Sequence, residues 1–209
     1  MSTVVVARKG GFATIAADTM TVFGNLRMGA TYKRSAEKIL RFGDTYLGVV
    51  GYSAHRLVVQ SLFSHPKVAR DFGSTEGIFE TLRQVHPILK QSYYLNPKLD
   101  PNDPYESSQI SMLVASPRGI FGVLTLREVF EYERFWALGS GQEYALGAMH
   151  ALYERSDSSE EIARAGIEAG CEFDDSSAQP CTVLTVALRP PSPARRRATP
   201  GRRGRKTPH

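Results

Sequence analysis

Two short runs decide the fold of this chain: Ser2-Thr3-Val4-Val5-Val6-Ala7 and Phe12-Ala13-Thr14-Ile15-Ala16-Ala17-Asp18. Both are apolar and rich in small or β-branched residues, and Gly10-Gly11 lies between them. Two β-rich runs separated by a break that contains glycine predict a β-hairpin. In the simplest register of that hairpin, Asp18 lies near Ser2, so a carboxylate and a hydroxyl meet at its open end.

Ser2 is the first candidate catalytic residue. Met1 precedes a small residue, so we expect methionine aminopeptidase to remove it and to leave Ser2 with a free α-amine. Such an amine has a reference pKa of about 7.7–8.0, so an appreciable fraction is neutral near pH 7. A residue that carries its own general base can activate a weak alcohol nucleophile. Met-Ser starts are common, but a strand that begins directly at residue 3 favours catalysis, because most termini fray.

The remaining patterns predict further strands and helices. Residues 39–42 and 45–51 flank a Gly43-Asp44 turn and predict a second hairpin. Two helical stripes follow, at 53–72 and from Ser74 or Thr75 onward, and Pro87 predicts a kink or break in the second one. Loops are expected around Arg27–Ala30 and at 96–105. The later elements are strands at 109–115, 120–125 and 129–136, helices at 144–153 and from 158 to about 170, and a strand at 181–188.

The order of these elements favours two sheets packed between helical layers over a doubly wound sheet, because the βαβ alternation is absent. A length of 209 residues suits one well-buried domain. We place that domain at 1–188 and a disordered tail at 189–209. The tail is rich in Pro and Arg and holds eight of the 26 Lys and Arg residues and no acidic residue, which leaves 18 basic and 21 acidic side chains in 1–188.

The charge and cysteine patterns exclude several classes of protein. The net charge of +5 comes from the tail, so the folded domain is not a basic nucleic-acid-binding fold, although the tail itself suits acidic surfaces or non-specific nucleic-acid contact. No signal peptide and no membrane-spanning run is recognisable, which makes the cytoplasm the default compartment. Cys171 and Cys181 form neither a metal spacing nor a disulfide framework, so we expect no metal and no cofactor.

Several motifs together resemble one family. The hairpin from Ser2 to Asp18 is followed by Glu37-Lys38-Ile39-Leu40, Leu47-Gly48-Val49-Val50-Gly51, and Leu138-Gly139-Ser140-Gly141 with Tyr144-Ala145. In this order and spacing they resemble the proteasome β-type family of N-terminal nucleophile hydrolases, close to HslV and, more narrowly, to the betaproteobacterial proteasome homologue. The resemblance covers about residues 2–188 and implies an α+β fold, the four-layer αββα sandwich.

The resemblance also implies a set of catalytic residues: Ser2 as the nucleophile, Asp18, a lysine, Gly48 and Ser140. The lysine is Lys33 or Lys38, and we favour Lys38 because in the family the lysine opens a strand. Lys38 would favour the alkoxide, Asp18 would hold the lysine, and Ser140 would orient the α-amine. The Gly48 amide would bind the oxyanion.

The activity implied by the resemblance is cleavage of peptide bonds inside stacked homo-oligomeric rings, with polypeptides fed in by a ring-shaped ATPase. No GxxxxGK[ST] motif occurs, so the chain does not itself encode the ATPase. Two other functions stay open: an inactive or weakly active scaffold protein of the same fold, and an amidase acting on small amides.

The chain departs from the family pattern in two places. Most members begin with threonine, whereas Ser2 lacks the methyl group that restricts χ1, so we expect slower turnover. The family also often places an aspartate near Gly170. Cys171 occupies that position here, with Asp174 and Asp175 just beyond it. We assign neither aspartate a role from the sequence.

Overall fold

The computed structural model describes residues 2–98 and 100–189. The predicted N-terminal hairpin is confirmed: β1 (Thr3–Lys9) pairs with β2 (Phe12–Asp18) in antiparallel fashion. Its turn is formed by Gly10 and Gly11, with φ of +58° and +81°. These left-handed values match the twist of a two-residue hairpin turn and favour glycine.

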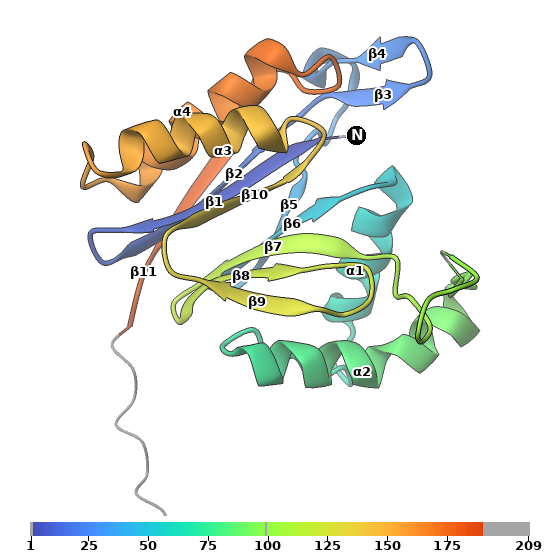
Figure 1. Ribbon diagram of the computed structural model, residues 1–209. Coiled ribbons are helices and arrows are strands. Elements are labelled where there is room, and N and C mark those ends of the chain that lie inside the picture. Colours follow the sequence, from blue (N-terminus) through green and yellow to red (C-terminus); the bar gives the residue numbers. More distant parts are fainter. Residues whose placement is uncertain (1, 99, 190–209) are drawn as a thin grey trace, which may run out of the picture.

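This hairpin forms the centre of a four-stranded sheet with the order β10-β1-β2-β11. The outer strands are β10 (Phe135–Gly139) and β11 (Cys181–Ala187). Two helices, α3 (Gln142–Tyr153) and α4 (Ser159–Phe173), cover one face of the sheet (Figure 1). Side chains of β1 and β2 pack there against Met149, Ile162 and Ile167, so the hairpin is anchored by an apolar layer.

The second sheet has five strands in the order β5-β6-β7-β8-β9. Its outer face packs against α1 (Ser53–Ser64) and α2 (Thr75–Ser92) (Figure 1). The strands are β5 (Ile39–Phe42), β6 (Thr45–Val50), β7 (Ser111–Ser116), β8 (Gly119–Val123) and β9 (Val129–Tyr132). The predicted second hairpin is therefore confirmed, with Gly43 at φ +62° in its turn.

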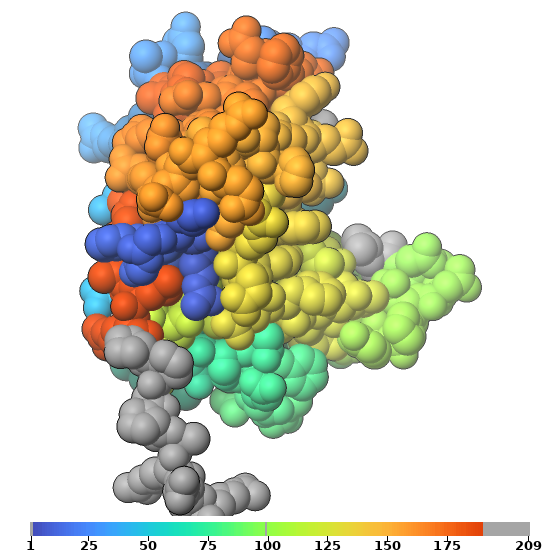
Figure 2. Space-filling model, turned by 60° about the vertical axis from the view of Figure 1, so that its left-hand side comes forward, coloured from blue at the N-terminus to red at the C-terminus, as the bar shows by residue number. Residues whose placement is uncertain are grey.

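The inner faces of the two sheets pack on each other. Val4, Val6 and Ile15 of the first sheet contact a cluster that includes Ile39 and Leu113 of the second sheet. The four-layer αββα sandwich is confirmed. Figure 2 shows the turn of the first hairpin (blue) at the surface beside the end of β11 (red), where the Leu188 N–H donates to the Gly11 carbonyl at 2.8 Å.

Some bounds of the predicted strands and helices are wrong. The predicted single strand at 129–136 is divided into β9 and β10, which belong to different sheets. The first helix ends at Ser64 rather than near residue 72, because Pro66 disfavours helical geometry at His65. The helix α2 continues through Pro87 to Ser92 without a break.

The segment after β2 forms a small hairpin instead of a loop. Its strands are β3 (Thr21–Phe23) and β4 (Leu26–Met28), joined by a turn at Gly24-Asn25, and a short 3-10 helix η1 (Ala30–Tyr32) follows. Within the described ranges, 2–98 and 100–189, no helix is long and apolar enough to cross a membrane. Arg189 is the last described residue, so the rest of the predicted tail lies outside the described part.

Candidate active site

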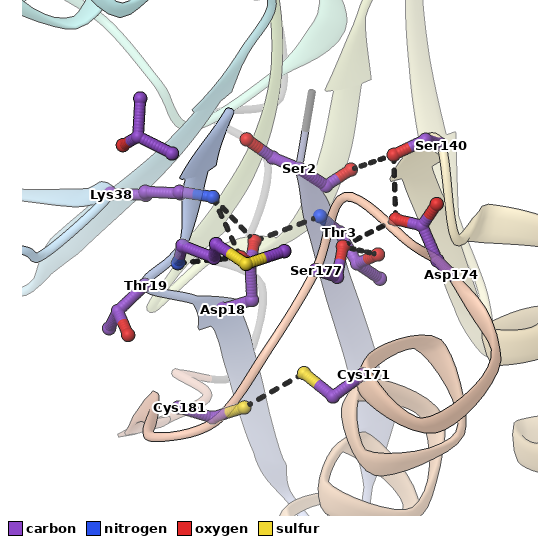
Figure 3. A network of polar contacts seen from close by, with 12 residues as sticks. Ser2, Thr3, Asp18, Thr19, Lys38, Ser140, Cys171, Asp174, Ser177 and Cys181 are labelled. Atoms are coloured by element: carbon purple, nitrogen blue, oxygen red, sulfur yellow. Dashed lines mark hydrogen bonds and ion pairs between the residues drawn. The ribbon is translucent and has the colours of Figure 1, made fainter. Parts of the chain in front are cut away.

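Asp18 lies at the open end of the first hairpin and is completely buried. Its Oδ1 accepts a hydrogen bond from the Thr3 N–H at 3.0 Å, and its Oδ2 accepts one from the Met20 N–H at 2.9 Å. The Lys38 ammonium donates to both carboxylate oxygens, at 2.7 and 2.8 Å (Figure 3). The cationic partner and the two N–H donors together offset the cost of burying this carboxylate.

Lys38 precedes β5 directly, and its side chain is only 12% exposed. Burial lowers the pKa of Lys38, and the attraction of Asp18 opposes this effect only in part. Lys33 lies elsewhere: its Nζ donates to the Thr19 carbonyl at 2.6 Å and to the Thr21 hydroxyl at 2.8 Å. Of the two candidate lysines, the structure therefore brings Lys38 to Asp18.

Ser2 precedes β1 and is 6% exposed. Its carbonyl oxygen accepts a hydrogen bond from the Ser140 N–H at 2.9 Å. This close approach depends on Gly139, which has φ +106° and where an added Cβ would lie 1.8 Å from the same carbonyl oxygen. Figure 3 shows Ser2 between Lys38 and Ser140. The structure thus gathers four of the five predicted site residues at one end of the sandwich.

A second polar network supports Ser140. The Ser140 hydroxyl donates to Asp174 Oδ2 at 2.7 Å, and the Ser177 hydroxyl donates to the same oxygen at 2.6 Å. Ser177 also exchanges a hydrogen bond with the Thr3 hydroxyl at 2.7 Å (Figure 3). Sequence reasoning gave no role to Asp174 and missed Ser177. Asp174 directly follows the end of α4, so the helix terminus places it beside Ser140.

The fifth predicted residue, Gly48, does not line the cavity beside Ser2, so the structure does not bring it to the other four. Gly48 lies inside β6, opposite Ile39 and Leu113. An added Cβ would lie 2.4 Å from Val4 Cγ1, so Gly48 faces the core between the sheets. The glycine is explained by this close packing.

The neighbouring amide, that of Val49, points to the opposite side of β6 from the Gly48 amide. Its N–H points to the Lys38 carbonyl across a long distance of 3.5 Å, near the limit for a hydrogen bond. Because successive N–H groups along a strand point to opposite neighbours, the Gly48 N–H faces β7 instead. Val49 is also one of the residues that line the cavity beside Ser2, whereas Gly48 is not.

The cavity has a volume of about 790 Å³ and contains both Ser2 and Lys38 in its wall. It lies between the β3–β4 hairpin, the segment that precedes β5, and the start of α1. Its apolar wall includes Met20, Val22, Met28, Val49 and Leu57. A partly apolar cavity beside convergent polar groups is the usual form of a substrate site.

Cys171 and Cys181 also lie next to this site. Their sulfur atoms are 3.5 Å apart, and both thiols are free. Cys181 stands opposite Asp18 in the pairing of β11 with β2. Within 2–98 and 100–189, no group of three or more His, Cys, Asp or Glu residues could hold a metal ion.

Comparisons with known proteins agree with this geometry. No family model matches the chain. The Thiobacillus denitrificans protein BPH, a bacterial proteasome homologue, is 39% identical, with 90% of this chain and 99% of that chain covered and a TM-score of 0.84. A second structure of BPH, in complex with epoxomicin, is 39% identical over 90% of this chain and 100% of that chain, with a TM-score of 0.83.

The chain therefore belongs to the proteasome β-type, HslV-like family of N-terminal nucleophile hydrolases, and it is similar to its bacterial proteasome homologues. Eukaryotic HslV from Trypanosoma brucei is 20% identical, covers 88% of this chain and 99% of that chain, and has a TM-score of 0.64. That likeness shows the shared fold. The chain has a proteasome-type peptidase fold.

Proposed function

We propose that this protein is a peptidase that cleaves peptide bonds with Ser2 as an N-terminal nucleophile after removal of Met1. The observation that carries the proposal is the buried Asp18–Lys38 ion pair beside Ser2, in the wall of a large cavity. A cation held by a buried carboxylate stabilises a developing alkoxide. The same arrangement leaves the cavity free to receive a peptide.

In the proposed reaction, the Ser2 hydroxyl attacks the peptide carbonyl and its own α-amine accepts the proton, directly or through a water. The tetrahedral intermediate collapses, the amine of the leaving peptide takes the proton, and an ester to Ser2 forms. Water then attacks the ester by the same route and releases the acid. The ester splits a difficult hydrolysis into two easier steps.

We assign the oxyanion to the Val49 N–H rather than to Gly48. The support is the direction of the two amides and the long, weak contact of the Val49 N–H with Lys38. Loss of one such donor typically costs about 10²–10³ in rate. Ser140, held by Asp174, orients the main chain of Ser2 and, after Met1 removal, its amine.

We further propose that residues 1–188 form the peptidase domain of a cytoplasmic protein that assembles into stacked homo-oligomeric rings. Membership of the family supports the rings, and closed homo-oligomers are the usual outcome for such chains. A ring-shaped ATPase and polypeptide substrates are proposed on the same ground. Residues 189–209 would form a basic tail outside that domain.

The test is peptide hydrolysis by three forms of the full chain: wild type, Ser2→Ala and Ser92→Ala. Alanine is also small, so Met1 removal is preserved in Ser2→Ala. Ser92 is an exposed serine at the end of α2 and serves as the matched control. We expect activity in the wild type and in Ser92→Ala and none in Ser2→Ala. Retained hydrolysis in Ser2→Ala, with its mass confirmed, would refute Ser2 as the nucleophile.

A further inference from the structure

The contact between Cys171 and Cys181 joins two elements beneath the candidate active site. Cys171 lies in the last turn of α4, and Cys181 is the first residue of β11. Their sulfur atoms are 3.5 Å apart although the residues are ten positions apart in the sequence. A disulfide has a sulfur–sulfur distance of about 2.05 Å, so a relative movement of roughly 1.5 Å would bring the two sulfurs to bonding distance.

The segment between the two cysteines carries part of the polar network of the site. Asp174 and Ser177 both lie in it, and they hold Ser140 and Thr3 by hydrogen bonds of 2.7 Å each. Residues 174–180 lie between the end of α4 and the start of β11 and are not in a helix or strand. A bond between the cysteines would therefore close this segment at its base (Figure 3).

The surroundings fit two reactive thiols better than a metal site. Both cysteines are half-buried, so a small oxidant can reach them. The nearby acid, Asp18, is already paired with Lys38. No larger group of metal-binding side chains occurs in the described part of the chain. Two sulfurs alone fall short of the four ligands of a structural zinc site.

We propose that Cys171 and Cys181 are an oxidant-reactive modification site, which hydrogen peroxide converts to a disulfide that clamps residues 172–180. One sulfur, as the thiolate, attacks a peroxide oxygen; the O–O bond breaks, a sulfenic acid forms and one water leaves. The second sulfur attacks the sulfenic sulfur as its thiol proton passes to the leaving hydroxyl group; the S–O bond breaks, the S–S bond forms and a second water leaves. The two sulfurs lose two electrons, which reduce the peroxide.

The polar contact between the thiols favours Cys181 as the attacking sulfur. A hydrogen bond from the Cys171 thiol lowers the pKa of Cys181, while burial opposes that effect. The same hydrogen bond, together with burial, raises the pKa of Cys171. The thiolate is the reactive form of cysteine, so the first step falls on Cys181 and Cys171 resolves the sulfenic acid.

The test uses the full chain, whose only two cysteines are this pair. The protein is treated with hydrogen peroxide, denatured without reductant, alkylated with N-ethylmaleimide and weighed by intact mass. We expect no maleimide on the treated wild type, which runs as a monomer on a non-reducing gel, and both thiols alkylated after treatment with dithiothreitol. Cys171→Ser and Cys181→Ser are the controls. Each retains one cysteine, so neither should form a disulfide within one chain and lose the mass of two hydrogens.

Two results would overturn the proposal. The first is a wild type whose two thiols are both still alkylated after exposure to peroxide that fully oxidises free glutathione. The second concerns the clamp: hydrogen exchange of the amides in 172–180 should slow at least severalfold in the disulfide form, because closing a segment removes open conformations. Unchanged exchange in a fully oxidised sample would refute the clamp. Neither readout depends on peptidase activity.

Discussion

The two hairpins that meet at the candidate active site contribute to it in different ways. The β1–β2 hairpin lies inside its sheet, with β10 and β11 on either side, so its backbone groups are used by neighbouring strands. It contributes side chains, those of Ser2 and Asp18. In the β5–β6 hairpin, β5 is an edge strand that begins only at Ile39. Beyond that point the Val49 N–H has only a long contact of 3.5 Å with the Lys38 carbonyl, and we propose that the hairpin contributes this backbone N–H.

The site obtains its rigidity from the open ends of the two hairpins. Both hairpins turn on left-handed glycines at the far end and are buried at the open end. The buried open ends are held together by the Asp18–Lys38 ion pair, which crosses from one sheet to the other.

The largest effect is expected from breaking the link between the hairpins. Lys38→Met leaves the carboxylate of Asp18 buried without its cation, and removing one partner of a buried pair costs about 3–5 kcal/mol. We expect a loss of free energy of unfolding near 3 kcal/mol, since two N–H donors remain on Asp18, together with loss of peptidase activity. Chemical denaturation and peptide hydrolysis measure the two effects.

Lys33→Met is the matched control for that prediction. It removes two hydrogen bonds from a partly solvent-exposed amine, and a typical hydrogen bond contributes about 0.5–1.5 kcal/mol. We expect a smaller loss of stability than for Lys38→Met and retained peptide hydrolysis. An equal loss of activity in both variants would contradict the assignment of Lys38 as the active-site lysine.

The second prediction concerns the role of Gly48 in the β5–β6 hairpin. In Gly48→Ala the new methyl group meets Val4 Cγ1 at 2.4 Å and Ile15 Cδ1 at 3.1 Å. Overpacking of this kind costs about 1–3 kcal/mol of folding stability. We expect a lower midpoint of thermal unfolding and a turnover that changes by less than the 10²–10³ typical of a lost oxyanion donor. A hundredfold loss of turnover in a folded variant would instead support the Gly48 amide as the oxyanion donor.

The third prediction concerns the support of the β1–β2 hairpin. Asp174→Asn replaces an oxygen that accepts from both Ser140 and Ser177 with an amide that accepts fewer bonds. Loss of one hydrogen bond to a charged acceptor is worth about 1.5 kcal/mol, or about tenfold in rate. Steady-state hydrolysis measures it, and an unchanged rate would show that Ser140 needs no such support.

How much of this site the sequence reveals depends on how local each contact is. The approach of Asp18 to Ser2 follows from one hairpin and its register, so it could be predicted from the run of residues 2–18. The choice of Lys38 came from a resemblance, because no local pattern shows which lysine crosses between the sheets. Asp174 and Ser177 were missed because their partners, Ser140 and Thr3, are distant in the sequence.

The difference between the expected and the observed surroundings of Gly48 has a cause related to that of the divided strand at 129–136. Which side of a strand an N–H faces depends on register, and a shift of one residue reverses it. A glycine near a site suggested a backbone role, whereas the packing of Val4 requires a glycine for another reason. The alternation along 129–136 continues through both β9 and β10, so it does not show where the chain changes sheets.

The smallest expected effect is the pH dependence of the reaction. The amine of Ser2 must be neutral, so the rate rises as the pH increases through about 8. Lys38 must be charged, and its pKa is lowered by burial, so the rate falls as the pH increases through a value below the ordinary 10.5. A pH–rate profile of peptide hydrolysis should be bell-shaped. A rate that stays on its plateau above pH 10.5 would contradict a role for charged Lys38.

Ser2 as a processed N-terminal nucleophile is tested most sharply by the intact mass of the pure protein after incubation with an epoxyketone such as epoxomicin. Such a probe requires both the hydroxyl and the free amine of the first residue. We expect removal of Met1 and a single adduct that maps to Ser2 in the wild type and is absent from Ser2→Ala. A wild-type chain that begins at Ser2 and gains no adduct, or an adduct that persists in Ser2→Ala, would contradict it.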